Sequence, residues 1–297
     1  MRIVVIGGTH FMGPHVVRLL TGHDVTVFHR GHDCRDSTQV HGDRANFPRD
    51  LHGDVVIDMI CMSEADARIS AAHFQTERMV VISSADVYRQ YDGLLGRYNG
   101  LPDSTPLRED APLREHLHPY GGDYEKILVE QILRGPQTTI LRLPAVYGPH
   151  DEQHRFAPWL KQMDDGVVTI QIDIRQAGWR WTRGYAENVA EAIIVAALNE
   201  RAAGKTYNVG EPDTPIEEEW LRLLGDAAGW LGRIERAENV EALNFNYDLV
   251  TDTSAIREDL GYRERVSRTE ALASTVAWER SGERPSRPQS PGVPPGD

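Results

Sequence analysis

The amino-acid sequence predicts an α/β protein built on a doubly wound parallel sheet, and two observations carry this prediction. Short runs rich in Val, Ile and Leu recur through the first half of the chain. The segments between them space their apolar residues three and four positions apart, as helices that cover a sheet do. Strands buried on both faces read as continuous apolar runs, so the alternation indicates parallel strands joined by helices.

The apolar runs give the elements in order. Five strands are predicted, at residues 2–6, 24–28, 54–58, 78–83 and 138–143. Helical spacing is clearest in "FMGPHVVRLL" and "EADARISAAHF", which follow the first and third strands. After Gly148 the pattern changes to longer helices with short strands between them. This second half is therefore predicted to form a smaller, mostly helical unit.

Composition excludes several classes of partner. The 297 residues include 32 basic and 45 acidic side chains, for a formal net charge of −13, which repels nucleic acid and anionic lipid. No apolar run is long enough to span a membrane, and the N-terminus lacks a secretory pattern. The two cysteines, Cys34 and Cys61, give no disulfide framework, and the histidines show no metal-ligand spacing. We expect a cytoplasmic protein without a metal site.

The segment "VVIGGTHFMG" carries the strongest local signal. Gly7, Gly8 and Gly13 follow the first strand directly and lead into a helix. Such a turn lets the backbone approach a pyrophosphate closely, so residues 7–13 are predicted to bind a dinucleotide: Gly7, Gly8, Thr9, His10, Phe11, Met12 and Gly13. A glycine turn that serves packing alone is the alternative.

The end of the second strand bears on the choice of dinucleotide. In the usual fingerprint an Asp or Glu at this position binds the ribose 2′-hydroxyl. Here the sequence reads "VFHRG", and Arg30 can instead pair with a 2′-phosphate. The sequence therefore favours NADP, with NAD as the second choice; a solvent-facing arginine is the alternative.

These motifs together resemble the extended and atypical short-chain dehydrogenases/reductases, the NAD(P)-dependent epimerase/dehydratase group. "GGTHFMG" is similar to their "TGGxGFIG" turn, with His10 in place of a glycine. "ISSADVY" is similar to "SSxxVYG", and "LRLPAVYGP" to "RxxNVYGP". The element "GDR" is similar to an acidic segment near the adenine, which adds Asp43 and Arg44 to the expected cofactor contacts. The resemblance covers about residues 1–280 and implies a Rossmann-type fold.

The resemblance also implies catalysis by a Ser, a Tyr and a Lys. Ser84 and Lys126 stand at the expected positions, and Lys126 would also hold the cofactor ribose. The family's Y-x-x-x-K pattern is missing, because Gly122 occupies the tyrosine position. If the helix has started by Asp123, Tyr124 points away from Lys126, whereas the flexible Gly121 and Gly122 let Tyr120 fold inward. Tyr120 is therefore the predicted substitute base, with both tyrosines as packing residues the alternative.

The predicted substrate contacts lie in the second half. The resemblance implies that Arg155, Arg180 and Arg183 grip a nucleotide-sugar diphosphate, although Arg180 is one residue out of register. The expected organisation is a dinucleotide-binding domain at 1–148, with a long cleft loop at 89–120. A substrate-binding portion at 149–280, interleaved with the sheet, and a disordered tail at 281–297 follow.

The leading hypothesis is an NAD(P)-dependent oxidoreductase or epimerase acting on a sugar-like hydroxyl or ketone, with a nucleotide sugar as a candidate substrate. The alternative is an NADP-binding sensor or scaffold without hydride transfer, because the usual tyrosine is absent. The sequence leaves a homodimer open. It does not separate reduction, epimerisation and dehydration.

Overall fold

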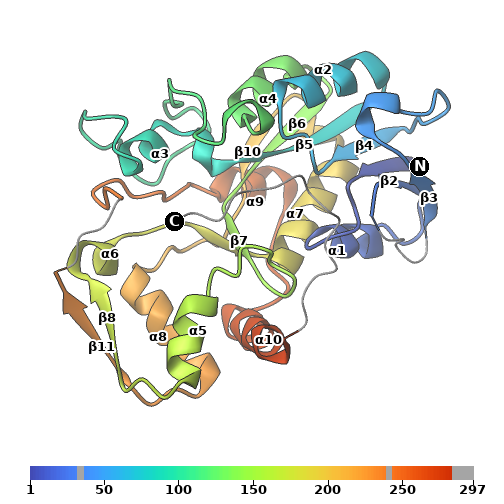
Figure 1. Ribbon diagram of the computed structural model, residues 1–297. Coiled ribbons are helices and arrows are strands. Elements are labelled where there is room, and N and C mark those ends of the chain that lie inside the picture. The colour runs from blue at the N-terminus through green and yellow to red at the C-terminus, as the bar shows by residue number, and fades with distance from the viewer. Residues whose placement is uncertain (32–36, 239–242, 283–297) are drawn as a thin grey trace.

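A computed structural model describes residues 1–31, 37–238 and 243–282 (Figure 1). Within these residues the main sheet has seven parallel strands in the order β10-β6-β5-β4-β1-β2-β3. The strands are β1 (Arg2–Ile6), β2 (Asp24–His29), β3 (Thr38–His41), β4 (Val55–Asp58), β5 (Arg78–Ser84), β6 (Thr138–Leu143) and β10 (Thr206–Asn208). The five predicted strands and the doubly wound α/β class are confirmed.

Helices cover both faces of this sheet (Figure 1). One face packs against α1 (Gly13–Leu19), α7 (Ala186–Leu198) and α9 (Ser254–Leu260). The other packs against α2 (Glu64–His73) and α4 (Lys126–Leu133). Successive residues of β1 alternate between the two cores, with Ile3 and Val5 in the first and Val4 and Ile6 in the second. This two-sided burial explains the unbroken apolar runs.

A second lobe lies beyond the carboxyl ends of the strands. Its core joins α5 (Ala157–Asp164), α8 (Glu217–Ala228) and α10 (Arg268–Ser281) with the parallel pair β8 (Thr169–Asp173) and β11 (Arg233–Ala237). The short helix α6 (Ile174–Gly178) follows β8. Between the lobes runs a second parallel pair, β7 (Ala145–Tyr147) with β9 (Arg183–Tyr185). The chain thus returns from this lobe to supply α7, β10 and α9 to the main sheet.

Two segments differ from the boundaries that the sequence predicted. The predicted loop at 89–120 begins with a helix, α3 (Arg89–Leu94), because buried Leu94 packs against Tyr247 and Leu249. This tertiary contact is invisible in local spacing. The tail expected from residue 281 starts later, since Ser281 still belongs to α10 and Gly282 caps it; residues 283–297 lie outside the described part. Within that part, no helix is both long and apolar enough to cross a membrane.

Candidate active site

The turn between β1 and α1 is closely packed. Gly7 has a φ of +84°, and its N–H donates to the carbonyl of Phe28 on β2 at 2.9 Å. A Cβ on Gly13 would lie 2.4 Å from the carbonyl carbon of Gly8, so only glycine lets α1 start this close to the turn. A Cβ on Gly31 would meet Thr9 at 3.1 Å, which places the turn beside the end of β2. This is the backbone approach that a dinucleotide pyrophosphate needs.

The three charged residues expected near the cofactor lie in different surroundings. The Arg30 side chain is 73% exposed and forms a 3.4 Å ion pair with Asp43. Asp43 also accepts a hydrogen bond from the N–H of Ala45. The side chain of Arg44 is turned inward, where it makes two 2.7 Å hydrogen bonds to the buried Asp58. The structure therefore brings Arg30 and Asp43 together and gives Arg44 an internal partner.

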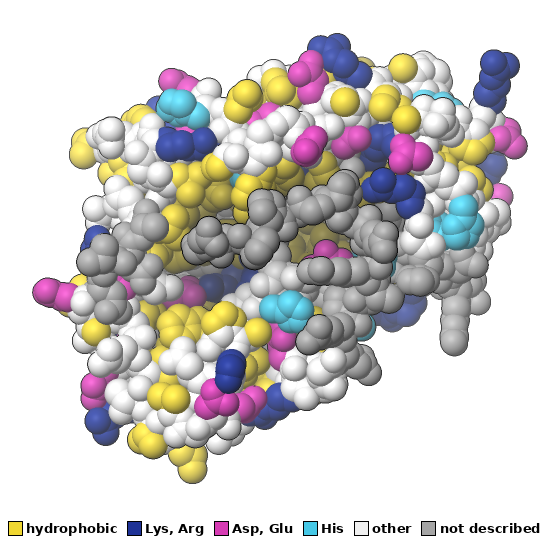
Figure 2. Space-filling model, in the orientation of Figure 1, with side chains coloured by type: hydrophobic (Ala, Val, Ile, Leu, Met, Phe, Trp, Pro, Cys, Tyr) yellow, Lys and Arg dark blue, Asp and Glu magenta, His cyan; other side chains and the backbone are white. Residues whose placement is uncertain are grey.

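A pocket of about 180 Å³ lies where β5 and β6 end. It is lined by Ser84, Ala85, Asp86, Tyr91, His118, Tyr120, Tyr124, Leu143, Pro144, Ala145, Gln153, Arg155, Trp181 and Leu249. The first nine of these come from the sheet lobe and its loops, Ala145 opens β7 between the lobes, and Gln153, Arg155, Trp181 and Leu249 come from later segments of the chain. In Figure 2 the molecule is hollowed between the two lobes, with hydrophobic side chains along the hollow.

The backbone before α4 differs from the expectation. Residues Gly121–Asp123 form a single 3₁₀ turn, and Tyr124 is extended, with φ −145° and ψ 106°. Helix α4 begins only at Lys126, and its N-cap is Glu125, whose carboxylate accepts from the N–H of Ile127. The prediction that the helix has started by Asp123 is wrong. The argument that placed Tyr124 on the face away from Lys126 therefore fails.

Tyr124 lies in the pocket beside Ser84. Its hydroxyl donates to Oδ2 of Asp86 at 2.6 Å. Burial, and then the neighbouring Asp86 carboxylate, raise the pKa of Tyr124 well above its usual value, and a hydrogen bond with Ser84 opposes this. Ser84 closes β5, and its Oγ accepts from the N–H of Asp86 at 3.3 Å. The hydroxyls of Ser84 and Tyr124 thus face one space.

Lys126 is buried at the base of this arrangement. Its Nζ donates to the carbonyls of Cys61 at 2.7 Å and Ile82 at 2.9 Å, so it links the ends of β4 and β5. The same nitrogen lies 5.7 Å from the centroid of the Tyr124 ring. Burial lowers the pKa of Lys126, while nearby acidic groups oppose this. Lys126 therefore lies close to the Tyr124 ring and to the ends of β4 and β5.

Tyr120 lies at the mouth of the pocket. It contributes to the lining, but its side chain is 77% exposed. Its ring contacts His118 at 4.7 Å between centroids and Tyr124 at 6.3 Å. Tyr120 is therefore near the site, as expected, yet less enclosed than Tyr124.

Of the three predicted substrate arginines, only Arg155 lines the pocket. Its Nε donates to the carbonyl of Val146 at 2.8 Å, and its guanidinium lies 5.7 Å from the Trp181 ring. Arg180 is exposed, and its N–H donates to Asp248. Arg183 is buried in the second lobe, where it pairs with Glu217 at 2.8 Å and stacks on Trp220. The lining thus presents one cation to a substrate.

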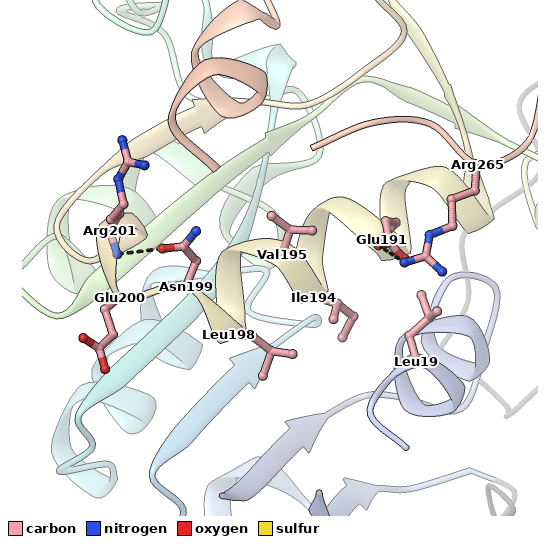
Figure 3. Close-up of a pocket in the computed structure, with 9 residues that line it drawn as sticks. All are labelled: Leu19, Glu191, Ile194, Val195, Leu198, Asn199, Glu200, Arg201 and Arg265. Atoms are coloured by element: carbon pink, nitrogen blue, oxygen red, sulfur yellow. Dashed lines mark hydrogen bonds and ion pairs between the residues drawn. The ribbon is translucent and has the colours of Figure 1, made fainter. Parts of the chain in front are cut away.

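A second, open pocket of about 770 Å³ lies on the outer surface between α1 and α7 (Figure 3). Leu19, Ile194, Val195 and Leu198 form its apolar part, and an ion pair between Arg265 and Glu191 closes one end. It shares no residue with the pocket at the strand ends and contains none of the predicted site residues. Among the described residues no cluster of His, Cys, Asp and Glu is suited to a metal ion.

Sequence reasoning missed several residues of the pocket, among them Asp86 and His118. Asp86 fell in a variable position of the "SSxxVYG" pattern, although a carboxylate just beyond a strand end is itself a signal in this class of sheet. His118 is one of the histidines for which the sequence showed no metal-ligand spacing, and no other signal pointed to it. No local pattern shows that the ring centroids of His118 and Tyr124 lie 4.6 Å apart.

Comparisons with known proteins agree with this geometry. Residues 67–210 match the profile of the NAD dependent epimerase/dehydratase family. The chain is 27% identical to a dTDP-glucose 4,6-dehydratase of Actinoplanes sp., over 95% of this chain and 98% of the relative. It is 25% identical to a UDP-glucose 4-epimerase of Azospirillum brasilense, over 95% and 93% of the two chains.

Solved structures show the same fold. A UDP-glucose 4-epimerase of Thermus thermophilus, in complex with NAD, superposes with a TM-score of 0.69 at 20% identity, over 95% of this chain and 100% of the other. The NAD dependent NDP-hexosamine 5,6-dehydratase TunA superposes with a TM-score of 0.71 at 19% identity, over 95% and 99%. The matched profile covers just under half of the chain, and two relatives align with it nearly end to end, so this chain is similar to the NAD dependent epimerase/dehydratase family.

Proposed function

We propose that the protein is an NAD(P)-dependent enzyme that oxidises a hydroxyl of a nucleotide sugar, as the hydride step of an epimerisation, dehydration or reduction. One observation carries the proposal: Ser84 and Tyr124 share a pocket at the strand ends, with Lys126 beneath the tyrosine ring. Ligands of doubly wound sheets bind at this edge. The curated relatives act on dTDP-glucose and UDP-glucose, which supports this substrate class.

The residues present fit a nicotinamide dinucleotide. The glycines let α1 start close against the β1–α1 turn, where a Cβ on Gly13 would meet the backbone of Gly8, and Arg30 and Asp43 stand at the end of β2. The cofactor would accept the hydride in the oxidising direction. Ser84 would orient the sugar oxygen, Tyr124 would exchange its proton, and Lys126 would contact the nicotinamide ribose. We retain NADP as the proposed preference because the exposed guanidinium of Arg30 stands at the end of β2, where it can attract a 2′-phosphate.

Tyr124 replaces Tyr120 as the proposed acid–base tyrosine. Its enclosure, its hydroxyl within the pocket and its ring beside Lys126 all favour it, whereas Tyr120 is mostly exposed. The sensor or scaffold alternative rested on the glycine at position 122. A tyrosine that reaches the site from position 124 removes that ground.

The pocket also bears on the substrate. A volume of about 180 Å³ suits a sugar ring rather than a whole nucleotide sugar. Trp181 and Tyr91 offer apolar faces to such a ring, and Arg155 offers a charge to a phosphate. The nucleotide would therefore extend into the hollow between the lobes.

Paired tyrosine variants test the proposal. With UDP-glucose and dTDP-glucose offered in turn with NAD or NADP, Tyr124→Phe is expected to lower turnover by about two to four orders of magnitude, the usual contribution of a general acid–base group. Tyr120→Phe, the matched control, should stay near the wild-type rate. Chromatography of the sugar nucleotides measures turnover, because epimerisation and dehydration return the hydride to the sugar; absorbance of the reduced nicotinamide measures any net oxidation. The reverse ranking would return the role to Tyr120, and no reaction of the wild-type protein with either sugar would contradict the proposed function.

A further inference from the structure

Asp86 is the pocket residue that the proposed roles leave unused. It lies in the 3₁₀ turn Ala85–Val87 that follows β5, with a side chain that is 14% exposed. Its Oδ2 accepts the 2.6 Å hydrogen bond from Tyr124. Its Oδ1 is buried and has no hydrogen-bond partner among the described residues. Leaving a carboxylate oxygen buried and unpaired costs stability, so its retention beside a reactive hydroxyl calls for an account.

The surroundings of Tyr124 disfavour a free tyrosinate. Burial and the adjacent carboxylate both raise the pKa of its hydroxyl. The Nζ of Lys126 donates hydrogen bonds to two backbone carbonyls. A tyrosine in this setting remains protonated near neutral pH, and cannot by itself accept the proton of a sugar hydroxyl. It can do so only if its own proton leaves at the same time.

We propose that Asp86 is the terminal proton acceptor of the oxidation step and that Tyr124 relays the proton to it. This inference rests on the proposed function. The carbon–hydrogen bond of the substrate breaks and its hydride passes to NAD(P)⁺. The hydroxyl proton passes to Oη of Tyr124, while the proton already on Oη passes to Oδ2 of Asp86. The sugar becomes a ketone, and reduction runs the same transfers backwards.

In this relay the carboxylate that raises the pKa of Tyr124 also serves as the base. A carboxylate 2.6 Å from the phenol makes tyrosinate harder to form, yet it is also the base that accepts the phenolic proton. Tyr124 then starts and ends the step neutral, so its raised pKa does not slow the transfer. The substrate oxygen only has to reach the hydroxyl that Ser84 also faces.

His118 is a positioning residue in this scheme. Its Nδ1 accepts from the N–H of Tyr120 at 3.3 Å, so the hydrogen of the neutral ring sits on Nε2, 3.9 Å from Oδ2 of Asp86. The backbone N–H of His118 donates to Glu125, the cap of α4, at 2.7 Å. The ring contact and this backbone contact together hold His118 while its imidazole faces the carboxylate.

Other charged groups also surround Asp86. Arg114 donates to the backbone carbonyl of Asp86 at 2.9 Å and pairs with Glu125 at 2.7 Å. Lys126 carries a positive charge below, and its pKa responds to Asp86. Tyr91, whose pKa is raised to about 12 chiefly by burial and then by Asp86, stacks on His118. Arg114 and Lys126 are therefore the cations that surround the proposed proton acceptor.

The variant Asp86→Asn removes the acceptor and keeps its shape. We expect turnover to fall by about two to four orders of magnitude, with little change in KM. The remaining rate should rise about tenfold per pH unit on the alkaline side, because only tyrosinate can then act as the base. The wild-type rate should instead be level over the same alkaline range, because the relay does not need tyrosinate. Unchanged turnover with a flat profile in Asp86→Asn would overturn the inference.

A spectroscopic titration tests the contact without turnover. Removing the carboxylate should lower the pKa of Tyr124, seen as earlier growth of tyrosinate absorbance relative to the same titration of Tyr124→Phe. The matched control is Asp92→Asn on α3, a buried acid that pairs with His116 and Arg97 and does not line the pocket. It should leave this titration and the pH profile unchanged.

Two further outcomes decide the remaining cases. Should Asp86→Asn fail to fold, as judged by thermal unfolding, Asp86→Glu supplies the comparison, because it keeps a carboxylate and must keep the levelled pH profile. A rate that rises tenfold per pH unit in Asp86→Glu would contradict the relay. A wild-type protein that turns over neither sugar would overturn the proposed function together with the relay, whereas an active wild type with an equally active Asp86→Asn overturns the relay alone.

Discussion

Two arginines that were predicted to bind the cofactor have different surroundings in the structure. Arg30 and Arg44 were both expected at the cofactor, yet one side chain is 73% exposed and the other is 9% exposed beside Asp58. Burial is the largest influence on the pKa of Arg44 and lowers it. The hydrogen bonds and the charge of Asp58 outweigh burial, so the pKa is raised. A buried guanidinium needs such a buried partner. Nothing in "GDR" distinguishes this role from a surface contact.

The exposed Arg30 makes a measurable prediction about cofactor choice. Arg30→Ala should weaken NADP binding roughly 1.4- to fivefold and leave NAD binding unchanged, since an exposed ion pair contributes only about 0.2 to 1 kcal/mol. Asp43→Asn is the companion variant, and it should strengthen NADP binding because it removes a carboxylate 3.4 Å from Arg30. Calorimetric titration of both cofactors is the measurement. Equal losses for NAD and NADP in Arg30→Ala would show that the arginine does not read the 2′-phosphate.

At the scale of elements, the start of α4 decides which tyrosine reaches the site. Asp123 resembled a helix cap in the sequence, but Glu125 takes this role because Arg114 and the N–H of His118 hold its carboxylate. Burial raises the pKa of Glu125, but Arg114 and these hydrogen bonds outweigh it, so the pKa is lowered. A cap fixed by residues seven and eleven positions away leaves no local signal. The strands, by contrast, correspond to apolar runs of five or six consecutive residues, so they could be predicted from the sequence.

The β1–α1 turn allows a prediction with a close control. In Gly13→Ala the new methyl would meet the backbone of Gly8 at 2.4 Å, so α1 must shift away from the turn. We expect lower stability, by about 1 to 3 kcal/mol as for other overpacked sites, and loss of detectable dinucleotide binding. Gly178→Ala places its methyl in open space and should be close to neutral. Denaturant unfolding and calorimetry measure the two effects; full cofactor affinity in Gly13→Ala would show that the turn does not hold the pyrophosphate.

At the scale of the whole molecule, the chain crosses between its two lobes several times. The sheet takes β10 and α9 from the second half, while β7 and β9 pair between the lobes. The pocket accordingly draws Ser84 and Tyr124 from one side and Arg155 and Trp181 from the other. The sequence indicated a change of rhythm after Gly148. It could not show which later segments return to the sheet, because that depends on strand pairing across 60 or more residues.

This arrangement predicts how ligands change global stability. A dinucleotide bound at the β1–α1 turn contacts the sheet lobe, so at a hundred times its Kd it should add about 2.7 kcal/mol and raise Tm by roughly 5 to 11 °C. UDP-glucose or dTDP-glucose, bound through Arg155 and Trp181 as well as Ser84, should raise Tm further and sharpen unfolding into one transition. Arg155→Ala should abolish the sugar nucleotide's increment and keep that of the dinucleotide, whereas Arg180→Ala, outside the pocket lining, should keep both. Thermal unfolding with each ligand alone and with both is the measurement. If the sugar nucleotide raised Tm equally in Arg155→Ala and the wild type, the substrate would not be held across the two lobes by this arginine.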